Sequence, residues 1–239
     1  MTENRLEFSE GVRLGIPIAL GYLSVSFTLG MTAVSVGIPV LSAVLMSASN
    51  LTSAGEASGI STMAVMGSFA ELILCQFIIN LRYALMSLSI SQKLDPSVTI
   101  ADRLFISFGI TDEIFAVIAS RKKLLNVRFF SGLLLLPFIG WTLGTALGAV
   151  FGQILPENIT AVMSIALYGM FIAIIIPPAK HSRNVLFAVV MAAVLSSIIY
   201  FVPAFDFISG GISVIICAVA ASAFCAWKFP TAEGGSADE

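Results

Sequence analysis

The sequence predicts an all-α polytopic membrane protein with about seven to eight transmembrane helices, some of them broken. Of the 239 residues, 58% are hydrophobic and only 11% are charged, whereas a soluble domain has about 25% charged residues. The mean hydropathy is +1.00. Apolar stretches that reach the roughly 20 residues needed to cross a bilayer recur along the chain.

Eight such stretches can be distinguished, and the second could instead be a re-entrant pair, which would leave seven crossings. The stretches are residues 12–36, 39–66, 69–92, 104–120, 129–153, 158–178, 184–203 and 207–228. We therefore expect a cytoplasmic N-terminal segment at 1–11, a transmembrane transporter domain at 12–228 and a disordered acidic tail at 229–239.

Basic residues concentrate in a few connectors, and this concentration predicts the orientation of the chain. Four basic residues lie at 121–128 and two lie at 180–183. With eight crossings and both termini cytoplasmic, every basic connector faces the cytoplasm except 93–103, which is a mild misfit. The sequence thus predicts a multi-pass protein of the cell inner (cytoplasmic) membrane.

Weak internal similarity suggests two related halves of four spans each. Residues 15–30, GIPIALGYLSVSFTLG, resemble residues 135–148, LLPFIGWTLGTALG. The two segments have the same orientation in the eight-span arrangement, as parallel repeats require; chance similarity between apolar helices is the alternative. Glycines at 140, 144, 148 and 152 are spaced by four residues, so we expect them to pack closely against a helix of this chain or of a partner.

Charged side chains interrupt two apolar stretches near their midpoints. Arg82 follows Asn80 in NLRYALMS, and Asp112 and Glu113 lie in ITDEIF. An arginine at the membrane centre costs at least about 3 kcal/mol on insertion scales, so it takes a partner in the interior. Adjacent residues point about 100° apart on a helix, so we expect one carboxylate to pair with Arg82 and the other to face a cavity or a polar group. A purely structural ion pair is the alternative.

A polar segment, SASNLTSAGEASG at 47–59, lies at the midpoint of the second apolar stretch. Its small polar residues loosen a helix, and unwound backbone in a membrane is tolerated only beside a cavity or within protein. A break would free N–H groups at Ser53, Ala54 and Gly55, which could bind a carboxylate at a helix N-terminus. An intact helix with small residues for close packing is the alternative. The candidate substrate-binding residues are Asn50, Thr52, Ser53, Ala54, Gly55, Glu56 and Asn80.

Glu56 lies beside the expected break. Burial disfavours the charged form of a carboxylate, so Glu56 is the candidate site for a coupling proton. The sequence contains no metal-ligand spacing, no catalytic triad and no ATP-binding motif. We therefore expect neither an enzyme nor a cofactor, and the lack of a basic stripe argues against nucleic-acid binding.

Four segments carry a resemblance to the AzlC family, the large subunit of a two-component branched-chain amino-acid exporter. They are TSAGEASG, IINLRYALMSLSISQKL (78–94), ITDEIFAV (110–117) and GWTLGTALG (140–148). The resemblance extends over residues 8–228 and implies a small AzlD-like membrane subunit as partner. Many relatives have glutamine in place of Glu56, so either this chain uses a protonatable group that its relatives lack or glutamate is a tolerated change at this position. The family motif residues that the resemblance places in the site are Ser53, Gly55, Asn80, Arg82, Thr111, Asp112 and Glu113.

The residues predict a secondary transporter for an amino acid or another anionic substrate, driven by exchange for protons. The resemblance implies that it exports leucine, isoleucine and valine, with methionine as a further candidate. The substrate carboxylate would bind at the break, and Arg82 would change its pairing with Asp112 or Glu113, beside Thr111, as access alternates. The open alternatives are an uncoupled channel or facilitator for amino acids or small solutes, and a membrane assembly subunit. The expected partners are therefore the substrate, protons, the lipid bilayer and the small subunit.

Overall fold

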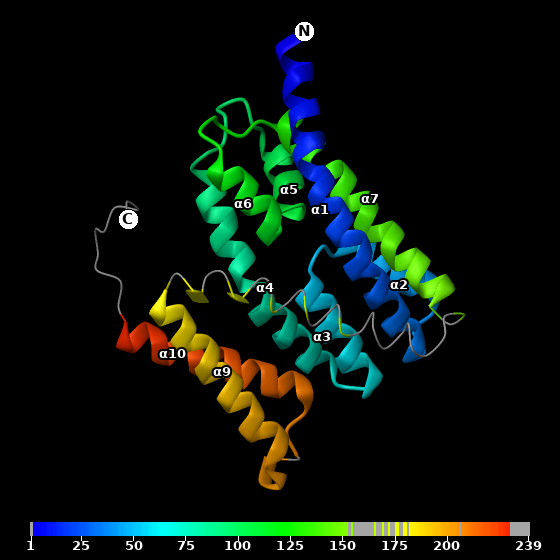
Figure 1. Ribbon diagram of the computed structural model, residues 1–239, viewed down its shortest axis with the longest axis vertical. Helices are drawn as coiled ribbons and strands as arrows, with labels where there is room; N and C mark the ends of the chain where they lie inside the picture. The colour runs from blue at the N-terminus through cyan, green and yellow to red at the C-terminus, as the bar shows by residue number, and fades with distance from the viewer. Residues whose placement is uncertain are drawn as a thin grey trace. The chain divides into compact units, whose positions relative to one another are not determined.

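The computed structural model is almost entirely helical and confirms an all-α polytopic membrane protein (Figure 1). The structure describes residues 2–152, 154, 165, 169, 172, 175–176, 179–180, 182–205 and 207–229. Most of the predicted stretch 158–178 and residues 230–239 of the predicted tail lie outside the described residues. The described helices that are long and apolar enough to span a membrane are α1 (Thr2–Ser35), α4 (Phe69–Ser91), α7 (Val127–Phe151), α9 (Arg183–Phe201) and α10 (Gly210–Lys228).

Two predicted stretches are each replaced by a pair of short helices. Helices of 9–12 residues are only about 14–18 Å long, roughly half of the ~30 Å hydrocarbon core. The broken helices that the sequence predicts are therefore present. The first hairpin consists of α2 (Val40–Ser49), the tip Asn50–Thr52 and α3 (Ser53–Ala64), and the second of α5 (Ile100–Phe108), the tip Gly109–Thr111 and α6 (Asp112–Ser120).

The second hairpin enters and leaves at the same end of the bundle (Figure 1). Leu125 N donates to Lys93 O (2.7 Å) and Asp95 N donates to Leu125 O (2.9 Å), so the chain before α5 is bound to the chain after α6. Asn126, one residue further, donates to Glu7 of α1. We call this end, where α1 and α7 begin, the basal end. The predicted crossing at 104–120 is wrong, because the tip reverses the chain halfway.

The connector at the base of the second hairpin is ordered by its own polar side chains. Ser97 donates its hydroxyl (2.6 Å) and its backbone N–H (2.9 Å) to Asp95, and these hydrogen bonds hold the pKa of Asp95 below its usual range. Thr99 and Asp102 then form a reciprocal capping box at the start of α5. The hairpin therefore begins from a fixed base.

The first hairpin turns back from the opposite end. Ser47 in α2 donates to Glu56 in α3 across the tip, a contact that a helix continuing in one direction could not make. α2 follows the end of α1 after the short link 36–39, and α3 leads to the turn before α4. The re-entrant alternative for 39–66 therefore holds. α4 then runs back past Asn80 to Lys93 at the basal end.

This path removes the misfit in the distribution of basic residues. Because the second hairpin does not cross, the connector 93–103 lies at the same end as 121–128. The expectation that 93–103 faces away from the other basic connectors is therefore corrected. All basic residues at these two connectors lie at the basal end.

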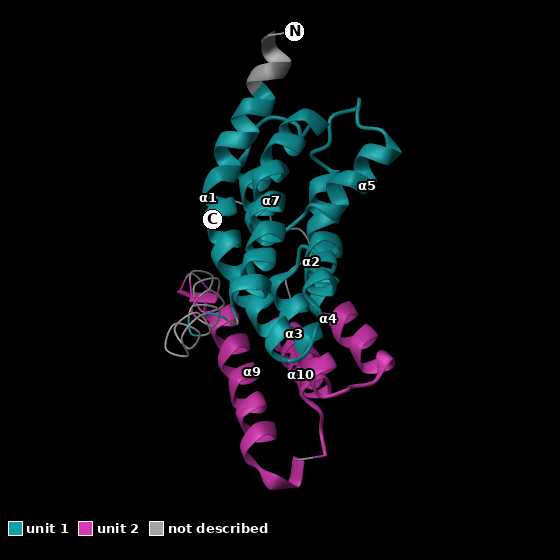
Figure 2. Ribbon diagram, turned by 90° about the vertical axis from the view of Figure 1, so that its right-hand side faces the viewer, with its two compact units in different colours: residues 1–60, 79–167 teal, residues 61–78, 168–239 magenta. Residues whose placement is uncertain are grey.

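α1 and α7 lie side by side and run in the same direction (Figure 2). Gly132 packs against the backbone of Phe8, and Gly148 against that of Phe27. The glycine ridge thus packs within this chain, and the shared direction agrees with the orientation predicted for the two similar segments. α1 begins at Thr2, so residues 2–11 continue the first helix without a structural boundary at residue 12.

Close packing of α1 on α7 predicts unequal effects for two matched glycine substitutions. A Cβ atom at Gly148 would overlap the carbonyl oxygen of Phe27, whereas a Cβ atom at Gly21 meets nothing within 4 Å. We expect Gly148→Ala to reduce the free energy of unfolding by about 1–3 kcal/mol through overpacking. Gly21→Ala should leave stability unchanged or raise it by up to about 1 kcal/mol. Thermal unfolding of the purified protein measures both, and equal shifts in Tm would contradict the packing.

The chain divides into two compact units (Figure 2), residues 1–60 with 79–167 and residues 61–78 with 168–239. In the second unit α9 and α10 form an antiparallel pair, in which Lys228 Nζ lies 5.1 Å from the centre of the Phe187 ring. At the other end of this pair, beyond the 3₁₀ turn Pro203–Phe205, Ser209 donates to Glu71 at the start of α4 (2.5 Å). The basic residues of this pair, Arg183 and Lys228, therefore share one end.

Candidate functional site

α4 links the tips of the two hairpins. Thr52 of the first tip donates to Asn80 Oδ1 (2.9 Å), and Arg82 Nη1 lies 2.5 Å from Asp112 Oδ2 beside the second tip. Residues two apart on a helix point about 200° apart, so α4 passes between the tips. The polar residues that the sequence places at one depth on three segments are thus brought together in the first unit.

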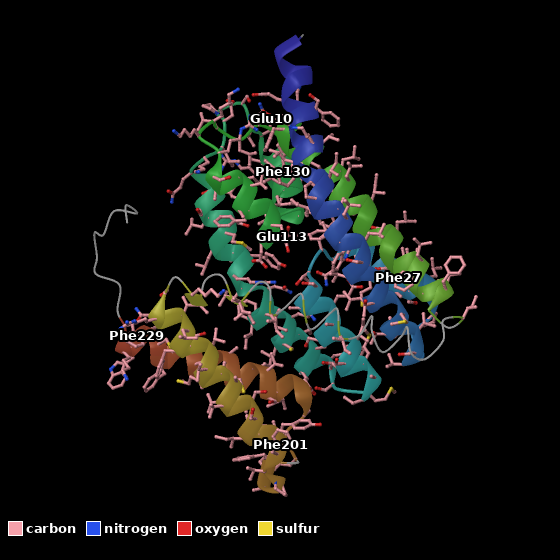
Figure 3. The ribbon with its side chains drawn as sticks, viewed as in Figure 1. Glu10, Phe27, Glu113, Phe130, Phe201 and Phe229 are labelled. Atoms are coloured by element: carbon pink, nitrogen blue, oxygen red, sulfur yellow. The ribbon has the colours of Figure 1, made fainter. Side chains whose placement is uncertain are left out.

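The second tip is bound to α1 through Tyr22. The Tyr22 hydroxyl lies 2.6 Å from Thr111 Oγ1 and 2.7 Å from Glu113 Oε2. Thr111 also caps α6 by accepting from Ile114 N (3.4 Å). Asp112 therefore pairs with Arg82 while Glu113 faces a different polar group, and Glu113 lies next to α1 in Figure 3.

The first tip uses Thr52 as the cap of α3. Thr52 Oγ1 accepts from Gly55 N (3.2 Å), so the expectation of a free Gly55 amide is wrong. The backbone amides of Ser53 and Ala54, also in the first turn of α3, are the remaining candidates for binding a ligand. Asn50 ends α2, and its backbone N–H donates to Ser47 O (3.3 Å).

Glu56 is buried in a polar cluster formed with α2 and α7. Its side chain is only 1% exposed, and Ser47 donates to Glu56 Oε1. Ser47 Oγ lies 2.6 Å from Thr145 Oγ1, which in turn donates to Trp141 O (3.2 Å). Among the described residues, Glu56 Oε2 has no hydrogen-bond partner. Glu56 thus joins α2, α3 and α7 in one enclosed cluster, and its predicted contact with substrate stays a prediction.

Trp141 joins this cluster to the second tip. Its ring packs edge-on against the ring of Tyr22, with centroids 5.3 Å apart, and Tyr22 bonds Thr111 and Glu113. A path of contacts therefore runs from Glu56 through Ser47, Thr145, Trp141 and Tyr22 to the second tip.

Sequence reasoning did not identify five residues of this site. Serine and threonine in apolar helices commonly bond to their own backbone, so their spacing gives no long-range signal. The aromatic residues offered a signal, because a tyrosine and a tryptophan occur inside the two similar apolar segments. The residues missed are Tyr22, Ser47, Tyr83, Trp141 and Thr145.

The ion pair at α4 is reachable from outside the chain. The Arg82 and Asp112 side chains are 37% and 32% exposed, and Arg82 Nη2 donates to the Tyr83 hydroxyl (3.3 Å). Charges at this depth are costly against lipid, so the pair requires a hydrated chamber or a covering chain. In the described part of the chain no group of three or more His, Cys, Asp or Glu side chains could hold a metal ion.

Comparison with known proteins places this arrangement among related membrane proteins. The family model described as AzlC protein matches residues 17–155, a range that contains both hairpins and α4. An uncharacterized membrane protein of Archaeoglobus fulgidus is 32% identical over 192 residues, which cover 78% of this chain and 82% of that protein. The inner membrane protein YgaZ of Escherichia coli is 23% identical over 202 residues, which cover 81% and 82%. No solved structure matches the chain.

Proposed function

Because the chain belongs to the AzlC family of membrane proteins, we propose that it is a secondary transporter that exports branched-chain amino acids in exchange for protons. The observation that carries the proposal is the meeting of two opposed hairpin tips on either side of α4. Broken helices at mid-membrane are how many secondary transporters build a substrate site.

The two tips offer complementary groups for an amino-acid zwitterion. The first turn of α3 presents the amides of Ser53 and Ala54 and the positive end of a helix, which favour a carboxylate. The first turn of α6 presents Asp112 and Glu113, which favour an ammonium group.

Opposed hairpins also supply alternating access. The first hairpin enters from the end where α1 and α7 finish, and the second enters from the basal end. Moving one hairpin therefore opens the site to one side while the other stays closed. Hinge-like motion of such elements around a fixed site is a common form of switching.

The Glu56 cluster supports proton coupling. No described basic side chain pairs with Glu56, and an unpaired buried carboxylate costs several kcal/mol. A protonated Glu56 fits the cluster, because it can donate to Ser47, Ser47 to Thr145, and Thr145 to the Trp141 carbonyl. Loss of the proton would favour hydration of Glu56 and separation of the first hairpin from α7.

Basic residues support an inner-membrane location with both termini cytoplasmic. In the first unit they gather at the basal end, around 93–103 and 121–128. In the second unit Arg183 and Lys228 share one end of the α9–α10 pair. The positive-inside rule assigns both of these ends to the cytoplasm. α1 begins at the basal end of the first unit, and α10 finishes at the basic end of the α9–α10 pair, so this rule places both termini in the cytoplasm.

A small AzlD-like subunit would have ample surface to bind. Few residues of α4 and α10, and none in the apolar window of α9, are buried within the chain. These helices are free to face lipid or a partner helix. A subunit packed against α4 would shield the side chains of Arg82 and Asp112, which are about one third exposed.

Counterflow of labelled amino acid tests the proposal. The purified chain is reconstituted into liposomes loaded with unlabelled leucine, with and without the small subunit, and uptake of labelled leucine is followed against labelled aspartate and lysine. We expect leucine counterflow in the presence of the subunit, and net uphill movement that a protonophore abolishes. Counterflow that a protonophore leaves intact while no uphill movement occurs would favour the uncoupled facilitator. No counterflow with either preparation would contradict transport.

A further inference from the structure

Arg121, at the C-terminal end of α6, ties the second hairpin to α1. Its Nη2 atom lies 3.3 Å from Glu10 Oε2 and 3.8 Å from Glu7 Oε1, and its side chain is only 9% exposed. Its guanidinium carbon lies 3.7 Å from the centre of the buried Phe129 ring at the start of α7. An arginine with two carboxylates and an aromatic face holds α6, α1 and α7 together at one point.

Further contacts of Lys93 and Asn126 hold the chain together at the basal end. Lys93, after the end of α4, donates to the carbonyl of Ala119 (2.5 Å) and to that of Arg121 (3.4 Å), where the negative end of a helix favours a cation. Asn126 donates to Glu7. Glu10 lies near the basal end of α1, well away from Glu113 near the tip (Figure 3). We call this set the basal latch, and its members are Glu7, Glu10, Lys93, Arg121, Asn126 and Phe129.

α6 connects the basal latch directly to the site. It is a single helix of nine residues, bound at its tip end by Tyr22 and Arg82 and at its other end through Arg121. Its inward residues Ile114 and Ile118 are fully buried. A helix this short moves as one body, so release of Arg121 would displace the tip as well.

We propose that the basal latch is the gate that closes the site towards the basal end, and that Arg121 releases the second hairpin when the site opens to that end. The latch is shut in this structure, with both carboxylates on Arg121. The physiological meaning of the gate rests on the proposed transport function, but its opening does not depend on any substrate.

Thiol labelling of the second tip tests the gate. Ile110→Cys, a buried position at the tip, is introduced after Cys75, Cys217 and Cys225 are replaced by alanine. A charged, membrane-impermeant thiol reagent is then applied from the basal side of the reconstituted protein. Arg121→Gln and Glu10→Gln should each raise the labelling rate at least about fivefold, the smallest shift typical of coupled states.

Lys122→Gln is the matched control, because Lys122 is an exposed neighbour that loses the same charge. It should leave the labelling rate unchanged. Equal rates for Arg121→Gln and Lys122→Gln would overturn the proposal. If Arg121→Gln fails to fold, equal rates for Glu10→Gln and Lys122→Gln would overturn it in the same way.

The outcome separates the gate from the proposed function. Faster labelling in a protein that moves no amino acid would support the gate and contradict the transport proposal. Leucine counterflow together with unchanged labelling in the latch variants would support transport and overturn the gate.

Discussion

Arg82→Gln should lower leucine transport at least about tenfold, a loss equivalent to about 1.4 kcal/mol in the transport barrier. The substitution leaves Asp112 without its counter-charge beside the second tip. It also removes the ion pair that links α4 to that tip, while Asn80 still holds the first tip. Initial rates of counterflow, normalised to the amount of reconstituted protein, measure the effect.

The double variant Arg82→Gln with Asp112→Asn separates a functional pair from a structural one. Replacing both members of an ion pair removes the uncompensated charge and commonly restores stability. Since both side chains are about one third exposed, we expect the single variant to lose less stability than the roughly 3–5 kcal/mol typical of a fully buried pair. The double variant should recover Tm but not transport.

Arg103→Gln is the control for this pair, because Arg103 is an exposed arginine in the first turn of α5. It should transport leucine at the parent rate. Full recovery of transport in the double variant would show that the pair only holds α4 and α6 in register, as the structural alternative states.

Glu56→Gln should make transport independent of pH while leaving substrate exchange intact. Glutamine keeps the size of the side chain and can still accept from Ser47, so the first hairpin stays against α7. It cannot release a proton, so uphill export driven by a pH gradient should fall to the uncoupled level, at least about tenfold lower. Leucine exchange and pH-driven export, measured on the same liposomes across pH, report the two quantities separately.

Glu71→Gln provides the matched control for Glu56→Gln. Glu71 is also a glutamate in a membrane helix, but it bonds Ser209 at the start of α10. Its replacement should preserve the pH dependence of export. An unchanged pH profile in Glu56→Gln, at full activity, would reject Glu56 as the proton site. Asp112 and Glu113, at the start of α6, would then be the remaining candidates.

The polar residues of the site could be anticipated because each is expensive in a membrane. Arg82 needs a counter-ion, and the cost of a lone charge predicts that Asp112 or Glu113 on the next segment supplies it. Only the structure shows that the partner is Asp112. The segment around Thr52 is too polar for an intact apolar helix, and a break occurs there. The roles of these residues in binding and coupling remain predictions.

The direction of the chain could not be anticipated from hydropathy. Residues 104–120 are apolar on average whether the segment crosses or reverses, because either arrangement would place it within the membrane. The hydrogen bonds of Leu125 with Lys93 and Asp95, and those of the Lys93 ammonium with the end of α6, show that both ends of the second hairpin meet. Glu56 presents the same difficulty, since its contact with Ser47 and, through it, Thr145 joins residues that are far apart in sequence.

The sequence by itself predicted an all-helical membrane protein with charged residues and a polar break near the midpoints of apolar segments, because transfer into lipid is additive over residues and each cost can be read from the residue type. The tertiary structure decided where those groups point: two hairpins that reverse at Asn50–Thr52 and Gly109–Thr111, with Arg82 between them and Glu56 turned to α7. The physical reason is that contacts between distant segments set the orientation of the side chains and the direction of the helices, and these contacts do not affect hydropathy.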